Sequence, residues 1–405
     1  MNKFVMYGAG NIGRGFIGQL FSNAGYKVGF VDINKEVIAR LNSDGRYPVN
    51  TVSGDINEET FVENVYGIDG TDIELVSEEI ASASIMATAI GVNVLRFIAR
   101  PIALGLKKRM ERNAPAFNII ICENLIGADE YLKELVCKEV PEIADYVHNN
   151  VGFVEASIGR MVPVMTEEKR QGNPLRVYVE PYNILPVDKA AFKGEIPEVG
   201  NLYPFSPFNL FIQRKLFMHN MSHALCAYLG NLRGYEYVYQ SIADYDIRYV
   251  AYKSLTEMAV AISLENGTEV AGLISHAENL LYRFTNEALG DTVFRVGRDT
   301  KRKLSSNDRL VGALKLAIKH GHQSNFLCLG IAAALLFAPD GDDSSKELSA
   351  YAEQNGVAAT LKTYSDLEGE PVVLITELYT ELKNGTPFVK LIKYCDDLSS
   401  SKMRV

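Results

Sequence analysis

Short apolar runs alternate with amphipathic stretches through the N-terminal part of this chain. The runs at 3–8, 26–32, 85–90 and 117–122 have the length and the bounding residues of buried strands. Apolar positions recur with helical spacing in 10–23, 34–41 and 101–112. Strands that alternate with helices in this way predict a parallel sheet covered by helices on both faces.

The pattern changes from about residue 176. Two strand-like segments, 176–180 and 182–186, precede almost continuous helical periodicity from Asn209 onward. The expected helices cover 210–229, 235–263, 269–289, 308–320, 326–337 and 346–354. A chain of 405 residues is long enough for more than one domain. We therefore predict an α/β protein with an extended Rossmann-type domain over residues 1–195 and a mainly α-helical substrate domain over 196–405.

A glycine fingerprint, G-x-G-x-x-G, lies between the first predicted strand and the helix that follows it. Gly8 permits a tight turn, Gly10 lets the backbone approach a pyrophosphate, and Gly13 lets the helix pack closely on the strand. The amino end of the helix then attracts the phosphates. The predicted dinucleotide contacts are Gly8, Ala9, Gly10, Asn11, Ile12 and Gly13. The alternative is a glycine-rich turn in another kind of α/β protein.

Asp32 closes the second predicted strand, about 20 residues beyond the fingerprint. A carboxylate at this place accepts hydrogen bonds from the ribose hydroxyls of NAD and repels the additional phosphate of NADP. We therefore expect the cofactor to be NAD.

Two later strands end in polar or small residues. Thr88 and Gly91 follow one strand, and Asn124 follows the next. Because the carboxyl ends of parallel strands line the ligand crevice, Thr88 and Gly91 are candidate cofactor contacts. The Asn124 amide is a candidate donor to a developing alkoxide. The alternatives are a plain strand-to-helix turn and an asparagine that caps a helix starting near Leu125.

The segment KLFMHNMSH places Lys215, Asn220 and His223 on one predicted helix, within a sector of about 140°. A desolvated lysine can act as the general base in alcohol oxidation. Asn220 can share an oxyanion clamp with Asn124, and His223 can orient substrate hydroxyls. The alternative is an amphipathic helix with a solvated lysine and a core histidine. His219, one turn after Lys215, is a competing candidate that we interpret as structural.

The segment FRVGRDTKRKLSSNDR concentrates positive charge in a chain whose net charge is −9. Its six basic residues face only Asp299 and Asp308 within the segment. Arginine binds phosphate through two parallel hydrogen bonds and lysine binds it as a point charge. The segment therefore predicts a local anion site, and the alternative is a solvated basic loop. Its basic residues are Arg295, Arg298, Lys301, Arg302, Lys303 and Arg309.

The overall charge and the cysteines narrow the class further. An acidic chain has no general attraction for nucleic acid or an anionic membrane. The start of the chain has no signal-peptide pattern, and no apolar run is long enough to span a bilayer. The five cysteines are scattered without C-x-x-C spacing, which indicates reduced thiols and no zinc site. We expect a cytoplasmic protein that uses no metal.

These motifs together resemble the polyol-specific long-chain dehydrogenase family. The matching segments are YGAGNIGRGFIG, FVDIN, CENL, FVEASIGRMVP, VDKAAFKG, RKLFMHNMSHALCAYLG and RVGRDTKRKLSSNDRL, which span the chain from about residue 3 to about residue 375. Two positions depart from the family pattern: Gly159 stands before Arg160 where an aspartate is usual, and Glu155 replaces an earlier aspartate.

The resemblance implies an NAD-dependent, metal-independent interconversion of mannitol 1-phosphate and fructose 6-phosphate, with the active site in the cleft between the domains. It makes Lys215 the acid/base, Asn124 and Asn220 the oxyanion donors, and His223 the substrate-orienting histidine. Substrate contacts are expected from Arg295, Lys303, Arg302 and Arg298. A sugar-acid reductase of the same superfamily, acting on fructuronate or tagaturonate, is the alternative enzyme. A non-catalytic NAD-binding regulatory protein is the alternative outside that class. The oligomeric state, monomer or dimer, stays open.

Overall fold

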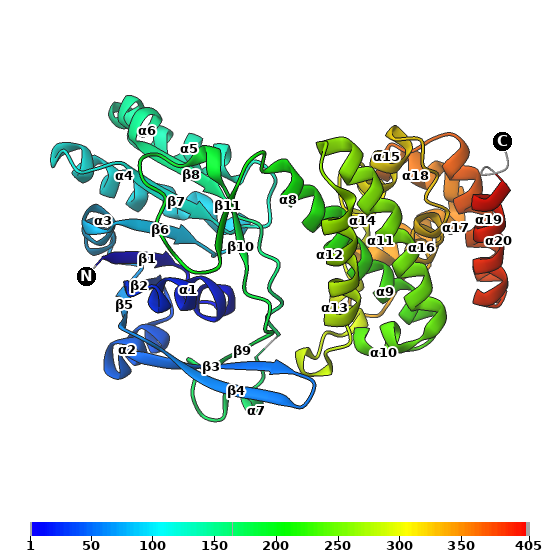
Figure 1. Cartoon of the computed structure of the whole chain (residues 1–405), viewed down its shortest axis with the longest axis horizontal. Helices are drawn as coiled ribbons and strands as arrows, with labels where there is room; N and C mark the ends of the chain where they lie inside the picture. Colours follow the sequence, from blue (N-terminus) through cyan, green and yellow to red (C-terminus); the bar gives the residue numbers. More distant parts are fainter. Residues whose placement is uncertain (1, 164, 402–405) are drawn as a thin grey trace. The chain divides into compact units, whose positions relative to one another are not determined.

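The computed structural model describes residues 2–163 and 165–401, which form two compact units, Met1–Phe211 and Ile212–Val405 (Figure 1). The sequence placed the boundary near residue 195. The division falls further along because strand β11 (Leu202–Phe205) pairs with β10 (Leu185–Asp188). Phe211 also packs edge-on against the rings of Tyr203 and Phe205. Residues 196–211 therefore complete the first unit.

The first unit is built on a six-stranded sheet in which every neighbouring pair is parallel. The order is β5 (Val65–Asp69), β2 (Lys27–Asp32), β1 (Lys3–Tyr7), β6 (Ile85–Thr88), β7 (Phe117–Ile121) and β8 (Val151–Glu155). Alternate residues of one strand enter different cores: Phe4 belongs to one cluster and Val5 to the other. The predicted Rossmann-type parallel sheet with two buried faces is confirmed.

Each face of the sheet has its own cover. One face packs against α3 (Ile73–Ser82), α4 (Leu95–Glu111), α5 (Ala128–Glu139) and α6 (Ala144–Asn150). The other packs against a π-helical segment (Gly13–Gly18), α1 (Gln19–Asn23) and α2 (Lys35–Asp44). Helix α4 begins six residues before the predicted Pro101, which lies inside it, because buried Leu95 and Ile98 extend its apolar face toward the sheet.

A smaller layer covers the second of these faces. It contains β4 (Ile56–Glu63), β3 (Arg46–Ser53) and β9 (Val177–Val179), with β3 and β4 forming an antiparallel hairpin. Helix α7 (Glu167–Arg170) lies just before β9 in the chain. The predicted strand at 176–180 corresponds to β9, whereas the strand predicted at 182–186 begins three residues later, as β10.

The second unit is helical, as predicted. The expected helix at 210–229 is a run of α8 (Asn209–Gln213), a π-helical segment (Arg214–Asn220) and α9 (Met221–Leu232). The expected helix at 235–263 is divided into α10 (Val238–Ala243) and α11 (Tyr245–Asn266), because the Asp244 side chain accepts the N–H groups of Asp246 and Ile247 and starts a new helix.

The remaining helices complete this unit, in which the residues of α9 and α16 are mostly buried. They are α12 (Val270–Arg283), α13 (Val293–Gly297), α14 (Thr300–Lys303), α15 (Val311–Lys319), α16 (Asn325–Leu335), α17 (Asp343–Asn355), α18 (Val357–Ser365), α19 (Glu370–Lys383) and α20 (Phe388–Ser401). Within the described residues, no helix has the length and apolarity needed to cross a bilayer.

Candidate active site

The glycine fingerprint forms a tight turn with open space above its middle. Gly8 has φ +108°, and a Cβ added there would lie 2.6 Å from the Ala89 carbonyl oxygen. A Cβ on Gly13 would overlap the carbonyl oxygen of Gly8. A Cβ on Gly10 would meet nothing within 4 Å. The two outer glycines are thus required by packing, while the backbone at Gly10 is accessible to a ligand.

Asp32 reaches back to this turn. Its Oδ2 accepts the backbone N–H of Ala9 at 2.8 Å, and its Oδ1 accepts that of Asn34 at 3.0 Å. The structure therefore brings two of the predicted cofactor residues, Ala9 and Asp32, into direct contact. The carboxylate also holds the turn in shape, which the sequence interpretation did not include.

Arg14 is a second support of the turn that the sequence did not single out. The side chain is buried, and its Nε donates to the Ala9 carbonyl at 2.8 Å while Nη1 donates to that of Pro174 at 3.0 Å. Burial lowers the pKa of Arg14 to about 10, so the guanidinium stays charged near neutral pH. Asn11 adds a long contact, from Nδ2 to the Pro163 carbonyl at 3.5 Å. The only sequence signal for Arg14 was its place directly after Gly13.

Glu123, just after β7, connects the carboxyl ends of β6 and β7 through hydrogen bonds. Its carboxylate accepts the Thr88 hydroxyl at 2.5 Å and the Ile90 backbone N–H at 2.9 Å. Burial raises the pKa of Glu123, and the hydrogen bonds oppose that shift. Gly91 follows with φ +89°. Thr88 is fully buried, and its hydroxyl donates to Glu123 and does not face solvent. In this structure Thr88 therefore supports the carboxyl edge of the sheet.

Asn124 is exposed and does not cap a helix. Helix α5 begins at Ala128, and the N–H groups of Gly127 and Ala128 donate to Glu155 Oε1 at 2.9 and 3.2 Å. The alternative interpretation of Asn124 as a helix cap is therefore wrong, because Glu155 caps that helix. Glu155, one of the two departures from the family pattern, thus has a structural task.

In the second unit, Lys215 and Asn220 lie in the π-helical segment and His223 lies in α9. The π-helical turn changes the angle between successive side chains, so the 140° sector expected for a regular α-helix does not apply. All three side chains are partly buried. π-helical turns are rare and occur frequently at functional sites, so this segment is a candidate for one.

His223 is held between a ring and a carboxylate. Its ring stacks on Phe284 with centroids 4.9 Å apart, and its Nε2 lies 3.2 Å from Asp291 Oδ2. Burial and the nearby cations, Arg295 first among them, lower the pKa of His223 to about 3. The imidazole is therefore neutral near pH 7. His219 is buried, and burial likewise lowers its pKa well below 6.5.

The basic segment is largely neutralised by carboxylates. Arg295 pairs with Asp291, Lys301 with Glu347, and Arg309 with Asp308. Arg302 bridges Asp299 and Asp308. Two of these partners, Asp291 and Glu347, lie outside the segment, where its own sequence does not indicate them. The segment consequently offers less unpaired positive charge than its sequence indicates.

Two cations of this segment behave differently from the rest. Lys303 is buried and its ammonium donates to the carbonyls of Val296, at 2.7 Å, and Arg298. Burial, with help from Arg309, lowers the pKa of Lys303 to about 7. Arg298 is exposed and forms no ion pair with any residue that the structure describes. Arg298 is therefore the cation of the segment most available to an anionic ligand.

The His, Cys, Asp and Glu side chains of residues 2–163 and 165–401 form no group of three or more that could hold a metal ion.

The parallel sheet and its glycine turn define a Rossmann-type dinucleotide-binding unit, here joined to a helical unit. The family models for the mannitol dehydrogenase Rossmann domain and the mannitol dehydrogenase C-terminal domain match residues 2–201 and 208–395. The chain therefore belongs to the mannitol dehydrogenase family of oxidoreductases.

Curated relatives match over nearly their whole length. Mannitol-1-phosphate 5-dehydrogenase of Caldanaerobacter subterraneus subsp. tengcongensis is 36% identical, covering 95% of this chain and 99% of the relative. The enzyme of the same name from Geobacillus thermodenitrificans is 36% identical, covering 94% and 99%.

Solved structures share the fold. A ternary complex of Pseudomonas fluorescens mannitol 2-dehydrogenase with NAD and D-mannitol aligns with a TM-score of 0.75 and 17% identity, covering 97% of this chain and 94% of that one. A D-sorbitol dehydrogenase in substrate-free form aligns with a TM-score of 0.77 and 16% identity, covering 94% and 93%.

Proposed function

We propose that this protein is an NAD-dependent, metal-independent dehydrogenase that interconverts mannitol 1-phosphate and fructose 6-phosphate. The observation that carries the proposal is the near full-length match to relatives named mannitol-1-phosphate 5-dehydrogenase. Lys215, Asn220 and His223 support it, because they lie on one helical run and supply the groups that alcohol oxidation needs.

The first unit fits NAD. The accessible backbone at Gly10 would accommodate the pyrophosphate, and Asp32 beside it would accept the ribose hydroxyls. Ile33, with 74% of its surface exposed directly after Asp32, offers an apolar contact for the adenine ring. When bound, NAD supplies the hydride acceptor for the reacting carbon.

Lys215 would act as the acid/base. In its neutral amine form it would accept the proton of the substrate hydroxyl as the alcohol is oxidised, and as an ammonium it would return the proton in the reverse direction. The Asn220 amide, on the same helical run, would donate to that oxygen, which gains negative charge in the transition state, and Asn124 of the first unit is the other proposed donor. His223, stacked on Phe284 and neutral at pH 7, would orient a substrate hydroxyl.

The basic segment would receive the phosphate. Arg298 is the leading candidate because no described carboxylate pairs with it. Arg295, one turn earlier in the chain, would contribute less because Asp291 already binds it. Arg302 would contribute less because Asp299 and Asp308 already bind it. Lys303 would act chiefly by fixing the backbone of Val296 and Arg298, since its ammonium donates to both carbonyls.

An NADH oxidation assay against a panel of sugars tests the proposal. The panel contains fructose 6-phosphate, fructose, fructuronate and tagaturonate, and the purified full-length chain is used. Fructose 6-phosphate is expected to be the best substrate, with mannitol 1-phosphate as the product. If only a ketohexonate is reduced, the protein is a sugar-acid reductase. If the protein binds NADH but reduces none of the four, it is not the enzyme proposed.

A further inference from the structure

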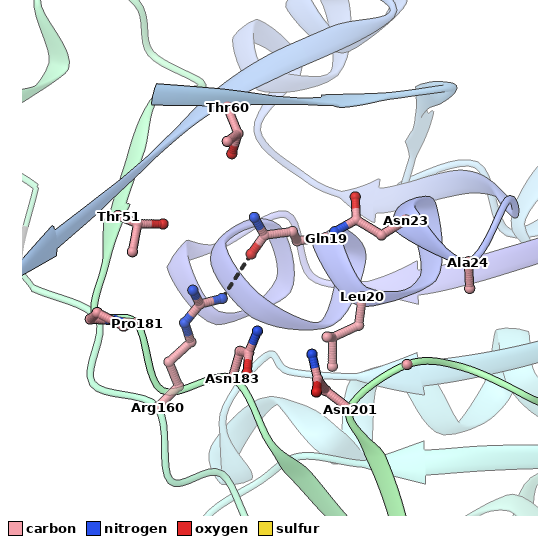
Figure 2. Close-up of a pocket in the computed structure, with 11 residues that line it drawn as sticks. Gln19, Leu20, Asn23, Ala24, Thr51, Thr60, Arg160, Pro181, Asn183 and Asn201 are labelled. Atoms are coloured by element: carbon pink, nitrogen blue, oxygen red, sulfur yellow. Dashed lines mark hydrogen bonds between the residues drawn. The ribbon is translucent and has the colours of Figure 1, made fainter. Parts of the chain in front are cut away.

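A pocket of about 310 Å³ lies in the first unit and shares no residue with the candidate active site. It is bounded by α1, by the β3–β4 hairpin and by the loops before β10 and β11 (Figure 2). Its size is at the lower end of the range for small-molecule sites, about 300–1,000 Å³. The site is therefore large enough for a small metabolite.

The lining is polar and contains no carboxylate or lysine. Amide groups come from Gln19, Asn23, Asn183 and Asn201, and hydroxyls come from Thr51 and Thr60. Figure 2 shows Gln19 and Asn183 beside the guanidinium of Arg160, with the other polar side chains farther out around the pocket. Such a lining offers many hydrogen bonds and a single positive charge to a ligand.

Arg160 is the anchor of this pocket. It is 5% exposed, and each of its recorded hydrogen bonds goes to a neutral oxygen: from Nε to the Glu180 carbonyl at 2.9 Å, and from Nη1 to the Gly15 carbonyl at 2.9 Å and to Gln19 Oε1 at 2.7 Å. Its second terminal nitrogen, Nη2, donates to no residue that the structure describes. The protein thus holds the guanidinium rigidly and leaves one face of it to the pocket.

The charge of Arg160 is only partly compensated. The Glu180 carboxylate adds a favourable charge interaction, but its Oε1 accepts the backbone N–H of Met161. Burial lowers the pKa of Arg160 to about 10, so the side chain remains a cation near neutral pH. A buried cation that hydrogen-bonds mainly to neutral groups is stabilised when an anion enters the adjoining space.

We propose that this pocket binds a small polyhydroxylated oxyanion, either a sugar phosphate or a sugar acid. The oxyanion would accept from Arg160 Nη2 and Gln19 Nε2, and the hydroxyls of the ligand would bond to the amides of Asn183 and Asn201. The proposal does not depend on the reaction that the enzyme catalyses.

Cysteine labelling of the full chain tests it without altering Arg160, whose loss would disturb the backbone at Gly15 and Glu180. The variant Asn183→Cys places a thiol in the pocket, and Asn149→Cys, on exposed α6 of the same unit, is the matched control. The wild type provides the background rate, since four of the five native cysteines are buried and Cys137 is partly buried. Modification rates are measured with inorganic phosphate, gluconate, sorbitol or no addition.

Phosphate or gluconate is expected to slow the labelling of Asn183→Cys by about tenfold at roughly ten times its Kd, because only the free pocket reacts. The control should be unaffected. Protection by phosphate alone would identify a phosphate ester as the ligand class, and protection by gluconate alone a sugar acid. Equal protection by sorbitol, or no protection by either anion, would overturn the proposal. A second variant, Asn201→Asp, should weaken the binding of the protecting anion in calorimetry, and unchanged affinity would also count against this site.

Discussion

Lys215 is the residue on which the proposed chemistry depends most. Lys215→Ala should lower kcat by at least ~10²-fold, the usual scale for general acid–base catalysis, with little change in NADH affinity. Small primary amines added to this variant should restore part of the rate, because they replace the missing proton carrier. Lys319→Ala, at the exposed last residue of α15, is the control for removing a lysine. A near-normal kcat for Lys215→Ala would refute the role, and His219 or His223 would then be the next candidate.

Asp32 supports the glycine turn and is proposed to bind the cofactor ribose, and two substitutions separate these tasks. Asp32→Ala should narrow the preference for NADH over NADPH and cost about 1–3 kcal/mol in NADH binding, since charged hydrogen bonds are lost. Asp32→Asn should narrow the preference as well, because the charge that repels a 2′-phosphate is gone. The asparagine variant should keep the turn more stable than the alanine variant does, since its amide oxygen can still accept the Ala9 N–H.

The measurements on these Asp32 variants are kcat/KM for both cofactors and thermal unfolding. A wild type that prefers NADPH would contradict the assignment.

Substituting Arg298 or Arg302 by alanine removes one positive charge in each case, so the two variants can be compared directly for their effect on phosphate binding. Arg298→Ala should raise KM for fructose 6-phosphate by about 10-fold or more, the effect of losing a charged hydrogen bond of about 1.5–3 kcal/mol. Arg302→Ala should have a smaller effect because Asp299 and Asp308 already bind that guanidinium. Neither change should alter KM for unphosphorylated fructose. A larger effect at Arg302 than at Arg298 would show that the phosphate contacts are misassigned.

At single residues, the sequence predicted the roles that depend on the local backbone. It missed the contacts made by residues that are distant in sequence. The outer glycines Gly8 and Gly13 follow from the turn itself, and the packing around them agrees. The neutralisation of the basic segment could not be predicted, because Glu347 lies on a helix distant in sequence. Asn124 invited an interpretation as a helix cap because nothing in the sequence indicates that Glu155 caps α5.

Among the helices of the second unit, the run from α8 to α9 buries two histidines in neutral form. Burial lowers the folded-state pKa of His219 well below 6.5 and that of His223 to about 3. An unfolded histidine protonates near pH 6.5, so the stability from keeping these rings neutral is present above that pH and is lost as the pH falls below it. Each such histidine contributes a loss of up to about 1.4 kcal/mol per pH unit.

His219→Gln should therefore reduce the difference in unfolding free energy between pH 7 and pH 5.5 by about 1 kcal/mol, whatever it does to stability at pH 7. Urea unfolding at the two pH values measures this difference. His148→Gln is the control, because His148 is exposed on α6. An unchanged difference in the His219 variant would mean that this ring is not held neutral in the folded protein.

Elements were easier to predict than their boundaries. Apolar runs and helical periodicity located β1, β2, β6 and β7, because strands buried on both faces are apolar throughout. The π-helical turn at 214–220 could not be predicted, since the apolar spacing of one wider turn differs little from that of an α-helix. The start of α4 was missed because Pro101 suggested a helix start, whereas it lies inside the helix.

For the whole molecule, the change from strand–helix alternation to continuous helical periodicity predicted the two kinds of unit. The place of the division depended on β11, whose pairing with β10 is a contact that periodicity does not record. Function was predictable at the level of the family because the glycine turn and the Lys-Asn-His helix are motifs tied to their chemistry. The proposed preference for a phosphorylated substrate would depend on which cations stay unpaired, and tertiary contacts decide that.

The ratio of kcat/KM for fructose 6-phosphate to kcat/KM for fructose, with NADH as the reductant, tests the central claim most directly. Contacts to a remote phosphate can orient the reacting carbon, so losing the phosphate should lower kcat as well as raise KM. We predict a ratio of ~10³ or more, equivalent to ~4 kcal/mol. The ratio should fall as ionic strength rises, because salt screens the phosphate contacts. Equal turnover of fructose and fructose 6-phosphate would contradict the account.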